Sequence, residues 1–258
     1  MKGRRIKSVS SFPGVSSGRA NRFLYAILFM AMAYFLVACT KLEGDSSTGK
    51  DSGGNVLRFD VWGPIGSLNP ITTTSGSTVM IAPFLNSYLF RENEQSQLKP
   101  DLATSWRYDS ETFTWTITLR EGALFHNGKS VTASDVKYSI QNQLHKCCSS
   151  LLSTINQITA IDNTGLTIVL NHDMPDFLEK IWSIDILPQP DGDDIGSMDH
   201  PIGAGPFKFD YQRGTEEVGL VVNTNYHGAH PSLDRVIFYS QPDKERSWAR
   251  LLAGKTDL

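Results

Sequence analysis

The sequence is poor in cysteine. Only Cys39, Cys147 and Cys148 occur among 258 residues. Adjacent cysteines form a disulfide only with strain, and a single pair makes no scaffold. The run from His145 to Cys148 contains possible metal ligands, but no second ligand cluster has zinc-site spacing. We therefore expect no disulfide framework and no metal, and we interpret the adjacent pair as two partly buried thiols at the end of a helix.

Motifs of catalytic chemistry are also lacking. The chain has no G-x-S-x-G nucleophile elbow, no P-loop and no H-E-x-x-H motif. Its acidic pairs, Asp193-Asp194 and Glu216-Glu217, lie in polar, loop-like stretches that are typical of a solvated surface. We predict that the protein is not an enzyme and uses no cofactor. A secreted hydrolase is the alternative, and it would need a nucleophile–base pair that these motifs do not supply.

Basic residues are scarce after the N-terminus. The first 38 residues hold six of the 24 Lys and Arg residues and none of the acidic ones, which leaves 18 basic against 27 acidic residues, a net charge of −9. A chain this acidic has no electrostatic footprint for nucleic acid. Nucleic-acid binding is therefore excluded.

The N-terminal segment has the layout of an export signal. A basic stretch from Lys2 to Arg22 precedes an uncharged apolar run of 16 residues, Phe23 to Ala38. That run is shorter than the roughly 20 residues of a spanning helix and suits a signal peptide. The run ends in Leu-Val-Ala-Cys39, which resembles the bacterial lipobox, whereas the alternative is an uncleaved anchor with an incidental cysteine. We predict a signal peptide over 1–38, lipidation of Cys39, and a flexible tether over 39–55 that is rich in Gly, Ser, Thr and Asp.

The most regular stretch of the chain lies between Pro100 and Leu144. Phe113, Trp115, Ile117 and Leu119 alternate with polar residues, which predicts a strand with one buried face. The turn over 109–112 connects this strand back to residues 105–108, so the two form a hairpin.

A capped helix follows in the same stretch. Asn127-Gly128 predicts a tight turn. Thr132 and Asp135 have capping-box spacing, and apolar residues then recur at helical intervals up to Leu144.

Other elements can be placed more coarsely. The patterns predict strands over 56–62, 218–222 and 235–240, a hairpin of 158–161 with 166–170, a helix through 80–89, a short helix over 175–181 with Phe177, Leu178, Ile181 and Trp182 inward, a loop over 187–198, and a helix over 243–252 with Trp248, Leu251 and Leu252 on one face.

The order of several motifs carries a family resemblance. P-x-L-A-x-S-W begins at Pro100, and it is followed by L-R-x-G, F-H-N-G-K and T-A-x-D-V-x-Y-S, then by P-I-G-A-G-P-F from Pro201. This order resembles the extracellular solute-binding proteins of family 5, the peptide and nickel receptors of ABC importers. Ala204 stands where the family usually has Thr, and His227 where it usually has Trp. The resemblance covers Val56 to Leu258.

The resemblance implies a fold and a domain arrangement. The expected fold is α/β, of the periplasmic-binding-protein-like class II, with an incomplete first lobe and a small inserted α/β domain. Residues 56–87 and 200–258 would form part of lobe I, residues 88–199 the inserted domain, and the second lobe would be absent. Gly203, Gly205, Pro206 and Phe207 would be architectural. Residues 256–258 resemble the entry to a further strand.

The resemblance also implies a function. The protein would capture oligopeptides or dipeptides in the periplasm or at the cell surface, anchored in the lipid membrane through Cys39, and deliver them to the ABC permease. The candidate ligand contacts are Thr74, Ser75, Gly76, Ser77 and Thr78. Hydroxyls and backbone amides at a helix start can bind a carboxylate or a peptide carbonyl, whereas the alternative interpretation is an ordinary Ser/Thr-rich helix cap.

A nickel or other small-solute receptor is the alternative function within the family. Thr and Ser occupy the early positions where the nickel branch has aromatic and Met contacts, so the segment favours peptides. His227 and His230, with His200 as a third ligand, could be a metal site, but we interpret them as surface histidines. Without the second lobe, we expect this chain to bind no peptide with normal affinity.

Overall fold

The structure, a computed structural model, describes residues 54–73, 75–95, 97–190 and 201–258. The predicted signal peptide, Cys39, most of the predicted tether, Thr74, Asp193-Asp194 and His200 lie outside these residues. No helix among the described residues is both long and apolar enough to cross a membrane.

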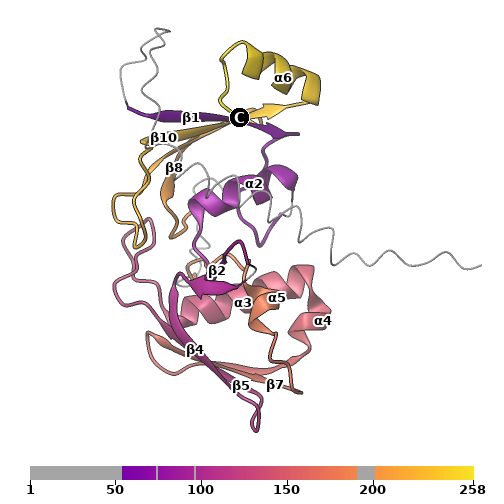
Figure 1. Ribbon diagram of the computed structural model, residues 1–258, viewed down its shortest axis with the longest axis vertical. Coiled ribbons are helices and arrows are strands. Elements are labelled where there is room, and N and C mark those ends of the chain that lie inside the picture. Colours follow the sequence, from indigo (N-terminus) through magenta and orange to yellow (C-terminus); the bar gives the residue numbers. More distant parts are fainter. Residues whose placement is uncertain (1–53, 74, 96, 191–200) are drawn as a thin grey trace, which may run out of the picture. The chain divides into compact units, whose positions relative to one another are not determined.

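Four strands form the first sheet, in the order β1-β10-β9-β8 (Figure 1). β1 (Val56–Trp62) is parallel to β10 (Arg235–Gln241), and β9 (Glu217–Val222) and β8 (Phe207–Arg213) are antiparallel to their neighbours. At the free edge of β1, the Leu258 N–H donates to the Arg58 carbonyl at 3.3 Å, and the Asp60 N–H donates to the Leu258 carbonyl at 3.0 Å. Residues 257–258 therefore begin a further pairing beside β1.

Helices lie on both faces of this sheet (Figure 1). Val61 belongs to the apolar cluster that contains Ile81 and Leu85 of α2 (Gly76–Leu85). The preceding residue, Asp60, accepts a hydrogen bond from Arg250 of α6 (Lys244–Leu252) at 3.2 Å. Successive strand side chains point to opposite faces, which places α2 and α6 on opposite sides of β1.

The end of α2 differs from the sequence prediction. The helix begins after Ser75, within the Ser/Thr-rich segment that the sequence places at a helix start, and Asn86 ends it in an extended conformation before the predicted Leu89. Leu89, the last residue of the predicted helix, is buried in a different apolar cluster. Apolar spacing alone extended the predicted helix to Leu89, whereas the extended conformation of Asn86 ends it.

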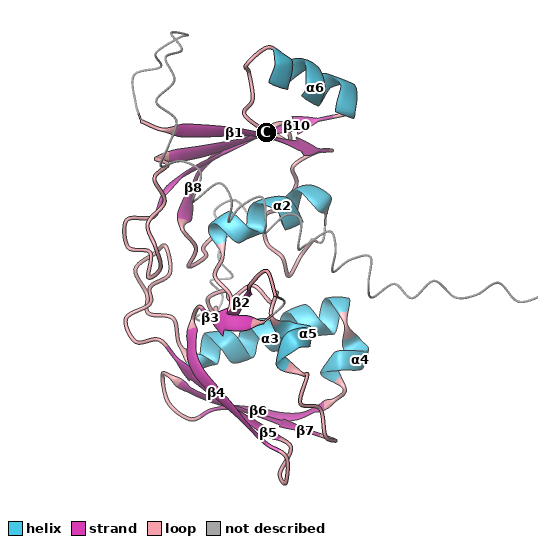
Figure 2. Cartoon of the chain, viewed as in Figure 1, coloured by secondary structure: helices cyan, strands magenta, loops and turns pink. Residues whose placement is uncertain are grey.

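The second sheet is antiparallel, in the order β4-β5-β7-β6 (Figure 2). Its strands are β4 (Ala103–Asp109), β5 (Thr114–Leu119), β6 (Ile155–Ala160) and β7 (Gly165–Leu170), and a small pair, β2 (Phe90–Glu92) and β3 (Leu98–Pro100), accompanies it. Both predicted hairpins are confirmed. Trp115, Ile117 and Leu119 are buried as predicted. Phe113 instead lies in the turn before β5, with a left-handed φ of 52°.

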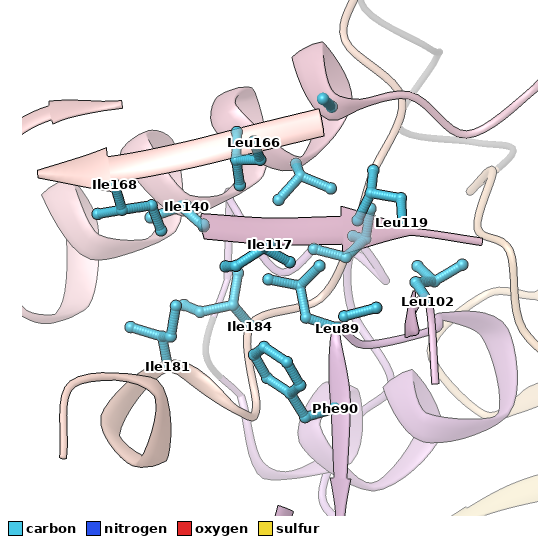
Figure 3. Close-up of a cluster of buried hydrophobic side chains, with 14 of the residues drawn as sticks. Leu89, Phe90, Leu102, Ile117, Leu119, Ile140, Leu166, Ile168, Ile181 and Ile184 are labelled. Atoms are coloured by element: carbon cyan, nitrogen blue, oxygen red, sulfur yellow. The ribbon is translucent and has the colours of Figure 1, made fainter. Parts of the chain in front are cut away.

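Helices cover one face of this second sheet (Figure 2). They are α3 (Ala133–Cys147), α4 (Ser149–Leu152) and α5 (Leu178–Ile181). The predicted capping box is confirmed, because Thr132 accepts from the Asp135 N–H and Asp135 accepts from the Thr132 N–H at 2.8 Å. Figure 3 shows Ile117, Leu166 and Ile168 of the sheet in the same buried cluster as Ile140 of α3.

Buried apolar residues fall into two clusters, one for each sheet. The first joins residues 57–85 to residues 207–238, and the second joins residues 89–186 to Ala204. Asn55, at the end of the predicted tether, is fixed to the first sheet, because its N–H donates to the Asp234 carboxylate at 2.7 Å. The contacts of the first sheet therefore include Asn55, the last residue of the predicted tether.

Candidate ligand-binding segment and the crossing between the sheets

The candidate ligand segment lies between β1 and α2. Ser75 is the N-cap of α2, and its hydroxyl accepts from the Thr78 N–H at 3.3 Å. The Ser77 hydroxyl donates to the Pro64 carbonyl at 3.0 Å, and the Thr78 hydroxyl donates to the Ser67 carbonyl at 2.8 Å. Ser77 and Thr78 are both buried. These two hydroxyls therefore tie the first turn of α2 to the loop that follows β1.

Because these hydroxyls are already bonded, a ligand would contact the backbone of the same turn. The first amides of a helix have no partner within the helix. Gly76 is exposed, and a Cβ built on it would have no neighbour within 4 Å. The Thr78 amide already donates to Ser75, whereas the exposed turn around Gly76 lies beside open space, where a carbonyl or carboxylate oxygen could approach the backbone. Ligand contact here remains a prediction, and Thr74 is not among the described residues.

Trp62 is a nearby residue that the sequence analysis did not single out. It ends β1 beside the end of β10, and 60% of its surface is exposed. The Lys244 ammonium lies 5.1 Å from the centre of its ring. Ligands of open α/β sheets bind outside the carboxyl ends of parallel strands. Trp62 becomes a candidate only because β1 pairs in parallel with β10. Sequence reasoning could not predict that pairing, since the two strands are far apart in the sequence.

Two glycines mark the place where the chain passes back from the second sheet to the first. The Gly205 N–H donates to the Leu85 carbonyl at 2.9 Å. A Cβ on Gly203 would lie 2.0 Å from the Leu85 oxygen, and one on Gly205 would lie 2.5 Å from the Leu85 carbonyl carbon. Two backbone segments cross here without room for a side chain. Pro206 and Phe207 follow directly, and Phe207 enters the first core as part of β8.

His126 holds this crossing from the side of the second sheet. Its Nδ1 accepts from the Gly203 N–H at 3.2 Å, and its Nε2 lies 3.2 Å from the Gly205 carbonyl. These partners define a neutral ring with its proton on Nε2. Burial lowers the pKa of His126 to about 4. The F-H-N-G-K motif therefore supplies a neutral clamp for the glycine crossing.

A buried charge cluster lies at the same junction. Asp101 pairs with Arg91 at 3.2 Å and with His227 at 2.8 Å, and Arg91 also donates to the Tyr226 hydroxyl. Burial by itself would raise the pKa of Asp101, but the hydrogen bond from His227 and the charge of Arg91 outweigh it and lower that pKa. The interpretation of His227 as a surface histidine is wrong, because its side chain is only 5% exposed. Sequence reasoning missed the contact because 126 positions separate His227 from Asp101.

A second buried carboxylate, Asp185, accepts from the Asn86 amide at 3.0 Å. Burial raises the pKa of Asp185 to about 6. His230 is exposed, unlike His227, and His200 lies outside the described residues, so a site of all three histidines stays untested. Among the described residues, no three His, Cys, Asp or Glu side chains are grouped to hold a metal ion.

The fold is that of an α/β solute-binding protein. Residues 97–258 match the family described as bacterial extracellular solute-binding proteins, family 5, middle part. The match spans more than half of the sequence, so the chain belongs to this family.

Individual relatives agree with that assignment. The chain is 27% identical over 255 residues to the oligopeptide-binding protein AppA of Bacillus subtilis. This alignment covers 92% of this chain and 47% of AppA. The structure of CtaP from Listeria monocytogenes, an ABC transporter substrate-binding protein, is similar with a TM-score of 0.71 and 26% identity, over 79% of this chain and 44% of CtaP.

A third relative points to a different ligand. NikZ from Campylobacter jejuni, in complex with Ni(L-His), matches with a TM-score of 0.68 and 26% identity, over 78% of this chain and 42% of NikZ. In all three comparisons the chain spans less than half the length of its relative.

Proposed function

We propose that this chain is part of the substrate-binding component of an ABC importer, which captures oligopeptides or dipeptides outside the membrane and delivers them to the permease. The observation that carries the proposal is the open first turn of α2 at Gly76, close to the carboxyl end of β1. Backbone amides at such a turn pair with the carbonyl or carboxylate oxygens of a peptide.

Peptides fit this segment better than nickel does. Its described side chains are hydroxyls, and those of Ser77 and Thr78 already donate to backbone carbonyls. A nickel complex remains the second candidate because NikZ, a relative of similar likeness, was solved with Ni(L-His).

The chain would supply one side of the binding site. Receptors of this architecture capture ligands by closing two lobes around them. Because the chain spans less than half of its relatives' length, we assign residues 54–258 to lobe I and its insertion. The groups that pair the peptide termini would lie on the other lobe.

Blocking Gly76 tests the proposal. In a hybrid receptor, residues 54–258 replace the matching part of AppA, and growth on peptides as the amino-acid source is measured in a strain that lacks its own receptor. We expect the hybrid to support growth and Gly76→Phe to abolish it. Gly66→Phe is the matched control, because a Cβ there also has no neighbour within 4 Å. Equal growth of the two variants would refute the role of the α2 turn.

Anchoring through Cys39 is a separate part of the proposal. The 16-residue apolar run before Cys39 supports a cleaved signal peptide. We expect the expressed protein to incorporate labelled palmitate and to partition into the membrane, and Cys39→Ser to do neither. Membrane partition that survives Cys39→Ser would indicate an uncleaved anchor instead.

A further inference from the structure

Two thiols adjoin at the end of α3. Cys147 is the last residue of the helix, and Cys148 turns the chain into α4 with φ −149° and ψ 53°. Cys147 is exposed, whereas Cys148 is half-buried against the second core. The two side chains hydrogen-bond to each other, and neither forms a disulfide.

This geometry favours a shared ligand over a disulfide. A disulfide between adjacent residues is strained, since it closes a small ring that distorts the peptide bond between them. Partial desolvation of its sulfur and the neighbouring Cys148 thiol raise the pKa of Cys147, so that thiol stays protonated at neutral pH. Protonated thiols are poor nucleophiles towards disulfides. A soft atom that binds both sulfurs needs no bond between them.

We propose that Cys147 and Cys148 form a dithiol site for trivalent arsenicals, with both sulfurs bound to one arsenic atom. With phenylarsine oxide, two S–H bonds break and two As–S bonds form, and the arsenic-bound oxygen leaves as water with the two thiol protons. Arsenic stays trivalent and sulfur keeps its oxidation state. The step therefore requires no oxidant or reductant.

The pair suits an atom that is bound by two sulfurs better than it suits a common structural metal. Structural zinc takes four protein ligands, and no group of three candidate ligands occurs in the described ranges. Once one sulfur has bound arsenic, the adjacent thiol reacts intramolecularly at a high effective concentration. Loss of either thiol should weaken capture by roughly 100-fold or more.

Occupation of the site leaves the buried face of α3 in place. The buried residues of α3 are Ala133, Asp135, Val136, Ser139, Ile140, Gln143 and Leu144. All of them precede the cysteines, and α4 contributes no buried residue. A bridge at the helix end therefore leaves the packed face of α3 in place.

The test uses the full 258-residue chain, reduced and desalted, with phenylarsine oxide as the probe. We expect intact-protein mass spectrometry to show one phenylarsine unit per chain with loss of both thiol hydrogens. A dithiol such as 2,3-dimercaptopropanol should strip the adduct at concentrations where 2-mercaptoethanol does not. Cys147→Ser and Cys148→Ser should each lose the stable adduct.

Two control variants separate capture by the adjacent pair from capture by Cys39 and from loss of the fold. Cys39→Ser keeps both thiols of the site and should bind like the parent. Cys147 is exposed, so Cys147→Ser should keep the parent's thermal midpoint and carries the test even if Cys148→Ser is unstable. An adduct that persists in Cys147→Ser, or no adduct in the reduced parent, would overturn the proposal.

Discussion

At the glycine crossing, close backbone contacts limit which residues can replace Gly203 and Gly205. Gly203 and Gly205 pass the Leu85 backbone at distances that no Cβ tolerates. The resemblance predicted glycines with an architectural role, but only the structure identifies Leu85 as the residue they pass. A local motif predicts a close approach of two backbone segments, but the segment that contains Leu85 lies outside the motif.

Gly203→Ala should therefore destabilise the fold. The added methyl would meet the Leu85 oxygen at 2.0 Å, and relief requires moving two backbone segments. We expect a loss of about 2 kcal/mol or more in unfolding free energy. Urea unfolding measures it, with Gly66→Ala, which meets no neighbour, as the control. A loss at Gly203 no larger than that at Gly66 would contradict the crossing.

His126 should make the fold sensitive to acid. Its folded pKa of about 4 lies below the ordinary value of 6.5, so the unfolded chain binds more protons between these values. Its contribution is present above pH 6.5 and is lost as the pH falls towards 4, by roughly 3 kcal/mol in total. His126→Gln keeps a donor and an acceptor without titrating. Relative to the parent, this variant should gain stability on acidification, and a pH-independent difference in urea midpoints would rule the clamp out.

Asp185 has the opposite effect on how stability depends on pH. Burial raises its folded pKa to about 6 from 3.8, so its favourable contribution is present below pH 3.8 and is lost as the pH rises through 6. The two groups therefore offset each other between about pH 4 and 6. We expect Asp185→Asn to steepen the loss of stability on acidification in the same urea series. A slope equal to that of the parent would show that Asp185 does not titrate in this range.

At the scale of elements, locally encoded features were predictable and non-local ones were not. The alternation in β5 and the capping box of α3 are written in consecutive residues, and both are confirmed. The parallel contact of β1 with β10 depends on tertiary pairing. The α6 helix was also predicted, but its periodicity does not say which face is covered: Trp248 is 63% and Leu252 is 84% exposed.

The α3 cap should be worth a measurable share of stability. Thr132→Ala removes the hydroxyl that accepts from the Asp135 N–H, and we expect a loss of about 1 kcal/mol. Ser134→Ala is the matched control, since Ser134 lies in the same first turn and is not among its buried residues. Equal thermal midpoints for the two variants would show that the cap contributes nothing.

At the scale of the whole molecule, family membership was the most predictable result. An ordered series of short motifs survives low overall identity, because each motif fixes a turn, a cap or a crossing. The ligand could not be predicted in the same way, since relatives of similar likeness include an oligopeptide receptor and one solved with Ni(L-His). Ligand choice depends on few side chains, and in the described ranges the candidate segment offers mainly backbone groups.

The 258-residue chain alone should bind peptides weakly. It would supply only one of the two surfaces that close on the ligand. In calorimetric titrations with a mixture of di- to pentapeptides, we expect no binding at micromolar or tighter affinity. Micromolar binding by the chain alone would mean that residues 54–258 hold a complete site.

The most direct test of a peptide-receptor lobe is calorimetry on the purified hybrid of residues 54–258 with the remainder of AppA. We expect micromolar or tighter binding of the peptide mixture, no heat from a nickel–histidine complex, and loss of peptide binding in Gly76→Phe but not in Gly66→Phe. A folded hybrid that binds the nickel complex and not peptides, or that binds neither, would contradict this expectation.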